Sequence, residues 1–416
     1  MKITLSKSSY SKHRIPQIIR YFTLAIVLVC SAEEVFSQKL ILEGKLLNAK
    51  NNSEPVPFAS IALQGKNIGT VSNEEGVFRL VVDNIMSQDT LVITHVSYDM
   101  KKVALNTILG KEIRLQLEPR EIVLNEIIIS AVPVTQLLEQ AIAASKKRIK
   151  VPVLFNTYYR EFVKQNDHYD KFADGQLVYY LEGKPGKINT TVKVIGSRAE
   201  ELKHEAEEEV DLETTSILDV QDAFSFYEVD RIGRFLKPEN YPDYEYSIRS
   251  IKDDAGNTLE QIEIKPKQEV QKMLLEAIIV IDPKTEVILS VAYQMSETHK
   301  QFAEEKNILV ARIKLADGHV RADYRLVGDQ YYLFYVRKSF AIKIWNKKRI
   351  NDTLEFLSDL VVTDFNPNVN GFDKKDSYKK RALYKRGTLY TEKYWETANI
   401  IPLTEAEEKI VQSLKK

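Results

Sequence analysis

The chain has 416 residues, of which 44% are hydrophobic and 28% are charged, with 59 basic and 59 acidic side chains. This length predicts two or three domains, and this composition excludes a largely disordered chain. Because the charges balance, no excess of basic residues favours nucleic acid as a partner.

The first 37 residues have the pattern of a secretory signal peptide. Five basic residues precede an apolar run at 21–30, and Val35 and Ser37 stand three residues and one residue before the expected cut. A basic start, an apolar core and small residues before the cut are typical of such leaders. We predict cleavage between Ser37 and Gln38, and export to the periplasm or to an outer-membrane-associated site. The apolar run is too short to span a bilayer, which needs about 20 residues.

Two alternatives to cleavage stay open at this stage. The segment could be retained as an N-terminal anchor, or Cys30, the single cysteine, could carry a lipid. Without residues 1–37, 54 basic and 57 acidic residues remain and there is no cysteine, which excludes disulfides, thiolate zinc sites and a cysteine nucleophile. No later apolar run is long enough for a membrane helix, so we expect the mature protein to be peripheral to a membrane at most.

Residues 38–131 favour a β-sandwich. Short runs of alternating apolar residues are separated by turn residues, a pattern typical of all-β sandwiches. We expect one strand to bury Ala59, Ile61 and Leu63, and another to bury Phe78, Leu80 and Val82. The expected strands span 41–47, 58–63, 77–82, 89–94 and 113–117.

Turn residues punctuate the same stretch. Residues 73–76 (NEEG) predict a hairpin turn that ends on a glycine. Gly65, Gly69 and Gly76 stand where a turn needs positive φ or where backbones approach closely. Phe58 and Phe78 supply large apolar side chains for the core of this small domain.

A set of motifs in this stretch is shared with a known family. They are Gly44, 55–61 (PVPFASI), Gly65, 69–70, 73–78 (NEEGVF), 91–93 and 124–128. With them, the stretch resembles the carboxypeptidase-regulatory-like, transthyretin-like module at the front of many Bacteroidetes envelope proteins. Ser97–Tyr98 departs from the Gly-Tyr that relatives often carry, which puts the turn there in doubt. The resemblance implies an accessory sandwich without peptidase chemistry.

Residues 132–416 predict a larger α+β domain built on an antiparallel sheet. A helix is expected at 134–149, where apolar residues recur at helical spacing and cations occupy the last turn. Strands are expected at 157–163 and 176–181. Downstream, three turns at 282–285, 316–318 and 328–330 join successive strands, a pattern that predicts hairpins.

Two further helices are expected in this domain. The charged stretch 199–210 has high helix propensity, and Thr404 with Glu407 forms a capping box ahead of a short terminal helix. Trp395 and residues 399–402 are expected to hold that helix in place. A long sheet with helices against it is similar, at the level of fold, to the half-barrels of lipoprotein carriers. The ending also resembles Bacteroidetes proteins that pair such a sandwich with a domain of unassigned role.

One motif raises the possibility of a metal site. His204 and Glu207 have the HxxE spacing of zinc carboxypeptidase ligands, and His299 or His319 could supply a third ligand. The same residues stand in a strongly acidic run between 200 and 211, which favours an exposed helix face. No cofactor or metal is predicted, and no nucleophile-elbow, Walker or dinucleotide motif occurs.

The remaining candidate residues are aromatic. His95 falls in an expected sandwich strand, where we predict a partly buried structural residue. The 21 tyrosines gather in the expected strands, either as a platform for sugars or peptides or as strand formers at half-buried positions.

These features favour a non-enzymatic cell-envelope protein that binds a partner or serves as a scaffold, with the sandwich as a docking or spacer module. The partner could be an envelope protein, a glycan or a lipid. The first alternative is a carrier or sensor of a lipid or other apolar ligand, with the C-terminal sheet curved around a cavity. It predicts a continuous apolar pocket of about 300–1,000 Å³. The second is a zinc hydrolase.

Overall fold

The computed structural model describes residues 39–414 except 67, 84–85, 96, 121–132, 202–217, 230–237, 253–257, 309–310, 347–350, 370, 390–394 and 396–397. The predicted leader, with Cys30 and the cleavage site between Ser37 and Gln38, lies outside these residues, as does the predicted boundary at 131–132. The described residues from Leu40 onward belong to one compact unit. Within this described part, no helix is both long and apolar enough to cross a membrane.

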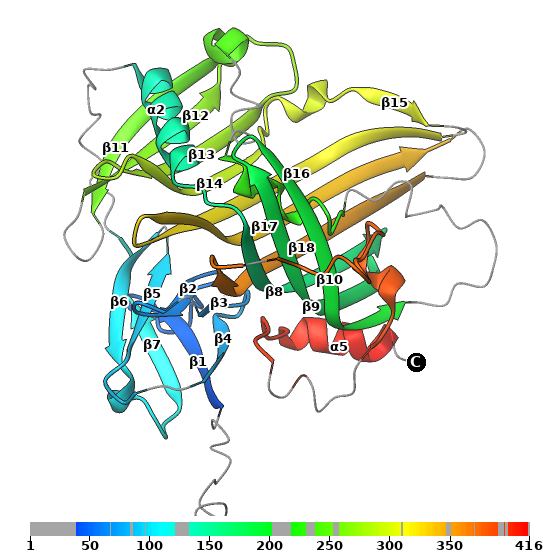
Figure 1. Ribbon diagram of the computed structural model, residues 1–416. Coiled ribbons are helices and arrows are strands. Elements are labelled where there is room, and N and C mark those ends of the chain that lie inside the picture. The colour runs from blue at the N-terminus through cyan, green and yellow to red at the C-terminus, as the bar shows by residue number, and fades with distance from the viewer. Residues whose placement is uncertain are drawn as a thin grey trace, which may run out of the picture. The chain divides into compact units, whose positions relative to one another are not determined.

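The front of the chain folds into two small sheets that enclose an apolar core (Figure 1). One sheet has the order β4-β1-β7 and the other the order β3-β2-β5-β6. All pairs are antiparallel except β1 with β7. The strands are β1 (Leu40–Asn48), β2 (Ser60–Leu63), β3 (Gly69–Val71), β4 (Val77–Val82), β5 (Thr90–His95), β6 (Tyr98–Ala104) and β7 (Ile113–Leu117).

The predicted inward faces of the sandwich are confirmed. The alternating residues of β2 and its approach, and those of β4, are all buried, because a strand points every second side chain to the same face. The turn at 73–76 is also present, with Gly76 at φ +74. It is not a hairpin, however, because β3 and β4 belong to different sheets. The Asn73 side chain shapes this turn by accepting from the backbone N–H groups of Glu75 and Val77.

Phe58 does not occupy the sandwich core as predicted. Its backbone has φ +55, an unusual value for a residue with a side chain, and its ring packs on the hydrophobic cluster of the large sheet instead. The ring is stacked on Tyr335, with ring centroids 6.5 Å apart. Phe58 therefore joins the sandwich to the strands that follow.

The helix predicted at 134–149 is confirmed as α2 (Val134–Lys147). Its buried residues, Leu138, Ala141 and Ser145, recur at helical spacing. The helix packs on β14 and β11 of the large sheet. The Ser145 hydroxyl accepts from the Ile288 N–H, so even the polar member of this face has a partner.

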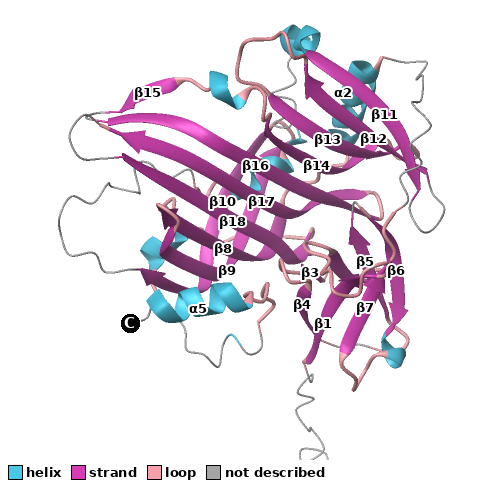
Figure 2. Cartoon of the chain, turned by 180° about the vertical axis from the view of Figure 1, so that it is seen from behind, coloured by secondary structure: helices cyan, strands magenta, loops and turns pink. Residues whose placement is uncertain are grey.

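Most of the remaining chain forms one antiparallel sheet of 11 strands (Figure 2). The order is β10-β9-β8-β18-β17-β16-β14-β13-β12-β11, and β15 also pairs with β16. The predicted fold class, mainly β with a small sandwich and a larger antiparallel domain, is confirmed. The strands are β8 (Val153–Gln165), β9 (His168–Lys184), β10 (Lys187–Glu201), β11 (Tyr244–Lys252), β12 (Thr258–Pro266), β13 (Leu275–Asp282), β14 (Val287–Met295), β15 (Glu305–Ile308), β16 (Ala311–Val327), β17 (Gln330–Trp345) and β18 (Asn351–Asn366).

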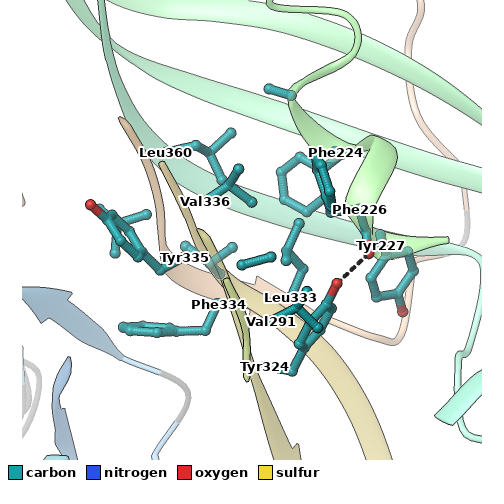
Figure 3. Packing of buried hydrophobic residues seen from close by; sticks show 14 of the residues in the cluster. Phe224, Phe226, Tyr227, Val291, Tyr324, Leu333, Phe334, Tyr335, Val336 and Leu360 are labelled. Carbon is teal, nitrogen blue, oxygen red and sulfur yellow. Dashed lines mark hydrogen bonds between the residues drawn. The ribbon is translucent and has the colours of Figure 1, made fainter. Parts of the chain in front are cut away.

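The centre of this sheet is buried on both faces. Strand β17 carries the run 331–336 (YYLFYV), every member of which is buried, as expected for a central strand covered on both sides. Figure 3 shows part of the packing, in which Phe224, Val336 and Leu360 belong to the same buried cluster. The Tyr324 hydroxyl donates to the Phe226 carbonyl at 2.9 Å, which satisfies a buried polar group.

The turns predicted at 282–285 and 328–330 are confirmed, but the one predicted at 316–318 is wrong. Strand β16 runs straight through these residues, with a bulge between Leu315 and Asp317. Gly318 stands opposite Phe340, and a Cβ at Gly318 would lie 3.0 Å from the Phe340 ring. The glycine therefore makes room for an aromatic neighbour rather than for a turn.

The helix predicted at 199–210 is wrong at its start. Residues 199–201 continue strand β10, paired with 171–173 of β9, and the rest of the stretch lies outside the described residues. Sheet pairing here outweighs local helix propensity, which is a weak preference.

The predicted terminal helix is confirmed as α5 (Glu405–Leu414), which lies against β9 and β10 (Figure 2). Both bonds of the capping box form. The Glu407 N–H donates to the Thr404 hydroxyl at 3.1 Å, and the Thr404 N–H donates to the Glu407 carboxylate at 2.8 Å.

Candidate ligand-binding cleft

A cleft of about 500 Å³ is lined by strands β2, β5 and β6 of the sandwich and by strands β12–β14 and β16–β18 of the large sheet. Its lining is largely apolar and includes Leu63 and Val92 on the sandwich side. Leu289, Leu326 and Phe334 line it on the side of the large sheet. A space of this size and character is typical of sites that take small organic ligands.

Strand β17 supplies both core and cleft. Tyr332, Leu333 and Phe334 all line the cleft, and the Tyr332 ring lies against Phe365 with centroids 3.7 Å apart. Because the strand is apolar along six consecutive residues, it can pack on two faces at once. The apolar wall of the cleft is therefore an extension of the protein core.

Arg325 stands out among the polar groups of the cleft. Its guanidinium donates to the Ser60 hydroxyl on β2 and lies over the Phe334 ring, 3.3 Å from the centroid. Within the described part of the chain, no carboxylate forms an ion pair with it. Burial lowers the pKa of Arg325 to about 9, and the charge of Asp323 offsets only part of that effect.

Several other cations of the cleft have acidic partners. Lys66 pairs with Asp89 at 2.6 Å, and Arg321 pairs with Asp323 at 2.9 Å. Asp323 also accepts from the Ser290 hydroxyl at 2.6 Å. Lys102 also lines the cleft and has no ion pair among the described residues, but it is exposed to solvent. Arg325 is therefore the partly buried cation of the cleft that lacks an acidic partner among the described residues.

His95, predicted as a partly buried structural residue, is confirmed in that role and also lines the cleft. Its Nδ1 accepts from the Ser97 N–H at 3.0 Å, and its ring meets Tyr98 edge to face. Burial, and then the charges of Arg321 and Arg120, lower the pKa of His95 to about 3. The imidazole is therefore neutral at physiological pH.

A row of charged residues crosses six neighbouring strands of the large sheet next to the cleft. Each member stands opposite the next in the strand register, so the side chains share one face. We call this set the charged row. From β10 to β16 its members are Arg198, Asp174, Arg160, Asp359, Arg337 and Arg321.

Asp359 is the centre of the charged row. It accepts from Arg160 Nε at 2.8 Å, from Arg337 Nη1 at 3.2 Å and from the Tyr335 hydroxyl at 2.6 Å. Both Asp359 and Arg160 are 0% exposed. The pKa of Asp359 is lowered, although burial alone would raise it. The charges of Arg337 and Arg160 lower it, and so do the hydrogen bonds that Tyr335 and Arg160 donate.

The charged row also ties other elements to the large sheet. Arg160 Nη1 pairs with Glu407 of α5 at 3.3 Å, and Arg337 Nη2 pairs with Glu74 of the sandwich at 2.6 Å. Beside these pairs, the Asn399 side chain both accepts from and donates to the Val81 backbone, at 2.6 and 2.9 Å. Of these contacts, the pair of Arg337 with Glu74 joins the sandwich to the large sheet, which form the two walls of the cleft.

The histidines of the proposed zinc site are not brought together by any described contact. His299 is buried and bonds to Thr298 and to the Lys267 carbonyl, whereas His319 is exposed and bonds to Asp317 and Gln294. Among the described residues, no group of three or more His, Cys, Asp and Glu side chains could hold a metal ion. His204 and Glu207 lie outside the described residues, so the hydrolase alternative stays untested.

The tyrosine platform is wrong for the central strands. Tyr158, Tyr159, Tyr179, Tyr331 and Tyr335 are fully buried, so they cannot present their rings to an external sugar or peptide. They are core residues whose hydroxyls find partners, as Tyr179 does on the Val220 carbonyl at 3.0 Å.

One titratable residue was not anticipated from the sequence. Glu161 on β8 is fully buried, and desolvation raises its pKa to about 7 despite hydrogen bonds from the Tyr384 N–H and the Tyr159 hydroxyl. No sequence signal distinguishes it from other acidic residues in strands, because its partners come from distant segments. Arg325 and Ser60 were missed for the same reason, since they are 265 residues apart in the chain.

Comparison with known families identifies the N-terminal part. Residues 42–129 match the family described as the CarboxypepD_reg-like domain, which confirms the predicted sandwich. No curated protein matches the chain.

Several solved structures share a distant likeness with the chain. A LolA superfamily protein from Nitrosomonas europaea is 11% identical, with a TM-score of 0.20, over 56% of this chain and 95% of that one. A DUF1329 family protein from Desulfovibrio piger is 10% identical, with a TM-score of 0.23, over 55% and 93%. Lipovitellin is 10% identical, with a TM-score of 0.24, over 58% and 27%. TM-scores this low do not establish a shared fold.

Proposed function

We propose that this protein is a non-enzymatic, exported cell-envelope protein that binds an apolar ligand in the cleft between the sandwich and the large sheet. The observation that carries the proposal is the cleft of about 500 Å³ with its largely apolar lining. Burying apolar ligand surface there is favourable by about 25 cal/mol per Å², and this gain opposes the free-energy cost of association. In this function the sandwich is one wall of the binding site rather than a separate spacer.

The absence of a catalytic role is part of the proposal. Asp323, the carboxylate that lines the cleft, is held by Arg321 and Ser290, so it is engaged in structural bonds rather than poised as a base. His95 is neutral and its Nδ1 is occupied by the Ser97 N–H. These groups are suited to shaping a site rather than to transferring protons.

A direct test uses a neutral apolar probe. N-phenyl-1-naphthylamine fluoresces strongly when it leaves water, so we expect saturable fluorescence on titration with the wild-type protein. Ala62 lines the cleft, and Ala62→Trp fills it with a large ring, so this variant is expected to lose probe binding. Ala104→Trp, on strand β6 but outside the lining, is the matched control and is expected to bind normally. Equal binding by both variants would show that the probe does not occupy the cleft.

Export is tested separately. The basic start, the apolar run and the small residue at Ser37 support a cleaved leader. N-terminal sequencing of the protein from an envelope fraction is expected to begin at Gln38. A sequence that begins at Met1 would contradict cleavage.

A further inference from the structure

We propose that the ligand of the cleft is an anionic amphiphile, whose charged headgroup binds Arg325 and Ser60 while its apolar chain lies along the large sheet. This inference rests on the proposed function and specifies its ligand class. The charged group on which it rests is Arg325, which lies at the apolar wall of the cleft.

Arg325 is placed by the shapes of its neighbours. Its guanidinium lies over the Phe334 ring and reaches Ser60 across the cleft. A Cβ at Gly69 would stand 2.8 Å from Arg325 Nη1, so this glycine leaves the space that the guanidinium occupies. Residues of β2, β3 and β17 therefore hold the side chain of Arg325, which extends from β16, in a defined position.

Among the residues that the structure describes, no carboxylate forms an ion pair with Arg325. Asp323 is occupied by Arg321 and Ser290, and Lys66 is paired with Asp89. A guanidinium has five N–H donors, and the hydrogen bond to Ser60 uses one of its nitrogen atoms, Nη2. Withdrawing an unpaired cation from water is unfavourable, so an anion that binds there removes an existing cost as well as adding new bonds.

The apolar surroundings define the rest of the ligand. Leu326 follows Arg325 directly on β16, and Leu289 lines the same cleft from β14. A small free anion would leave these side chains uncovered, whereas an acyl chain attached to the anion would cover them. A carboxylate and a phosphate monoester present the same chemistry to a guanidinium, since both accept two parallel N–H donors.

The test compares matched amphiphiles that differ in headgroup charge. Dodecanoate, dodecyl phosphate and dodecanol are each used to displace N-phenyl-1-naphthylamine from the wild-type protein at a pH of about 8, where the acids are ionised. We expect dodecanoate to displace the probe at a concentration at least about tenfold lower than dodecanol, because charge-assisted hydrogen bonds of this kind discriminate by that amount or more. Preference for dodecyl phosphate over dodecanoate would assign the site to phosphate headgroups, and the reverse would assign it to carboxylates; both support the proposal.

Three variants test whether the preference depends on Arg325. In Arg325→Gln the ratio between dodecanoate and dodecanol is expected to fall to about one, because the charge is gone. Lys101→Gln removes a cation from the neighbouring strand β6 at a position that does not line the cleft, and it is expected to keep the wild-type ratio within about twofold. Circular dichroism of Arg325→Gln confirms that the variant is folded, and Arg325→Lys, which keeps the charge, is expected to retain part of the preference.

The outcomes separate this inference from the proposed function. Saturable probe binding with equal displacement by dodecanoate and dodecanol overturns the anionic ligand and leaves the apolar cleft in place. An equal loss of preference in Lys101→Gln and Arg325→Gln overturns the specific role of Arg325. No probe binding at all overturns both.

Discussion

Replacing Asp359 with asparagine tests whether the charged row stabilises the fold. The substitution keeps the size of the side chain but removes the charge and turns one accepting oxygen into a donor. Arg160 and Arg337 then lose the carboxylate that lies 2.8 and 3.2 Å from them, and the Tyr335 hydroxyl can lose its acceptor. Because Arg160 is 0% exposed, water cannot replace the lost partner.

The magnitude follows from the burial of these groups. Breaking a buried ion pair by removing one partner typically costs about 3–5 kcal/mol, because the other charge stays buried and uncompensated. Arg160 keeps Glu407 and Arg337 keeps Glu74, so we expect a loss near the lower limit, about 3 kcal/mol. Such a loss is a large part of the total stability of a typical domain, about 5–15 kcal/mol.

The assay is urea unfolding followed by circular dichroism near neutral pH. Neutral pH is chosen because the pKa of Asp359 is lowered in the folded protein. The stabilisation by Asp359 is therefore fully present above the pKa of the unfolded state, about 3.9, and is lost as the pH falls through the pKa of the folded state.

Glu355→Gln on the same strand is the matched control. Glu355 faces Lys164 at 3.6 Å and is 38% exposed, so we expect a change of at most about 0.5 kcal/mol. A loss of under about 1 kcal/mol for Asp359→Asn, or one equal to that of Glu355→Gln, would refute the reasoning.

Three further substitutions test other parts of the structure. Burial raises the pKa of Glu161 to about 7, so the wild type loses stability as the pH rises from about 4.5 to about 7. Relative to the wild type, Glu161→Gln should gain about 3 kcal/mol of unfolding free energy over that pH range. Parallel pH profiles of the two proteins in urea unfolding would contradict this. Gly69→Ala introduces a Cβ 2.8 Å from Arg325 Nη1 and should cost about 1–3 kcal/mol by overpacking; an unchanged unfolding midpoint would mean that the space is not filled. Thr404→Ala removes the cap of α5 and should cost about 1 kcal/mol in the same assay, whereas wild-type stability would mean that the helix is held by its packing alone.

The sandwich could be predicted from the sequence because its signals are local. Alternation at 59–63 and 77–82 fixes which side chains turn inward, and the glycines at 65 and 76 have the positive φ that their turns require. Phe58 is the exception. Its positive φ directs the ring to Tyr335, a partner 277 positions away that no local pattern reveals.

The large sheet was predicted only in outline. Hairpins at 282–285 and 328–330 follow from turn chemistry, and the cap at Thr404 follows from a four-residue motif. The pairing of β8 with β18 does not, because the two strands are separated by about half the chain and each is compatible with many partners. The turn expected at 316–318 fails for a related reason, since Gly318 is required by Phe340 across the sheet.

The cleft could not be located from the sequence at all. Its lining comes from segments between residues 60 and 365. Its distinctive feature is an arginine that has no acidic partner in the described part of the chain, which is a property of the fold rather than of any motif. Sequence analysis could predict that a pocket of this size would exist if the protein carried an apolar ligand. It placed that pocket within the curve of the large sheet, whereas the structure forms it from the large sheet and the sandwich together.

A crystal structure of the protein grown with dodecanoate tests the central claim most directly. We predict electron density for the acyl chain along Leu289, Leu326 and Phe334, with its end between the sandwich and the large sheet. Density on any other surface, or a cleft that holds only ordered water at saturating ligand, would contradict the account.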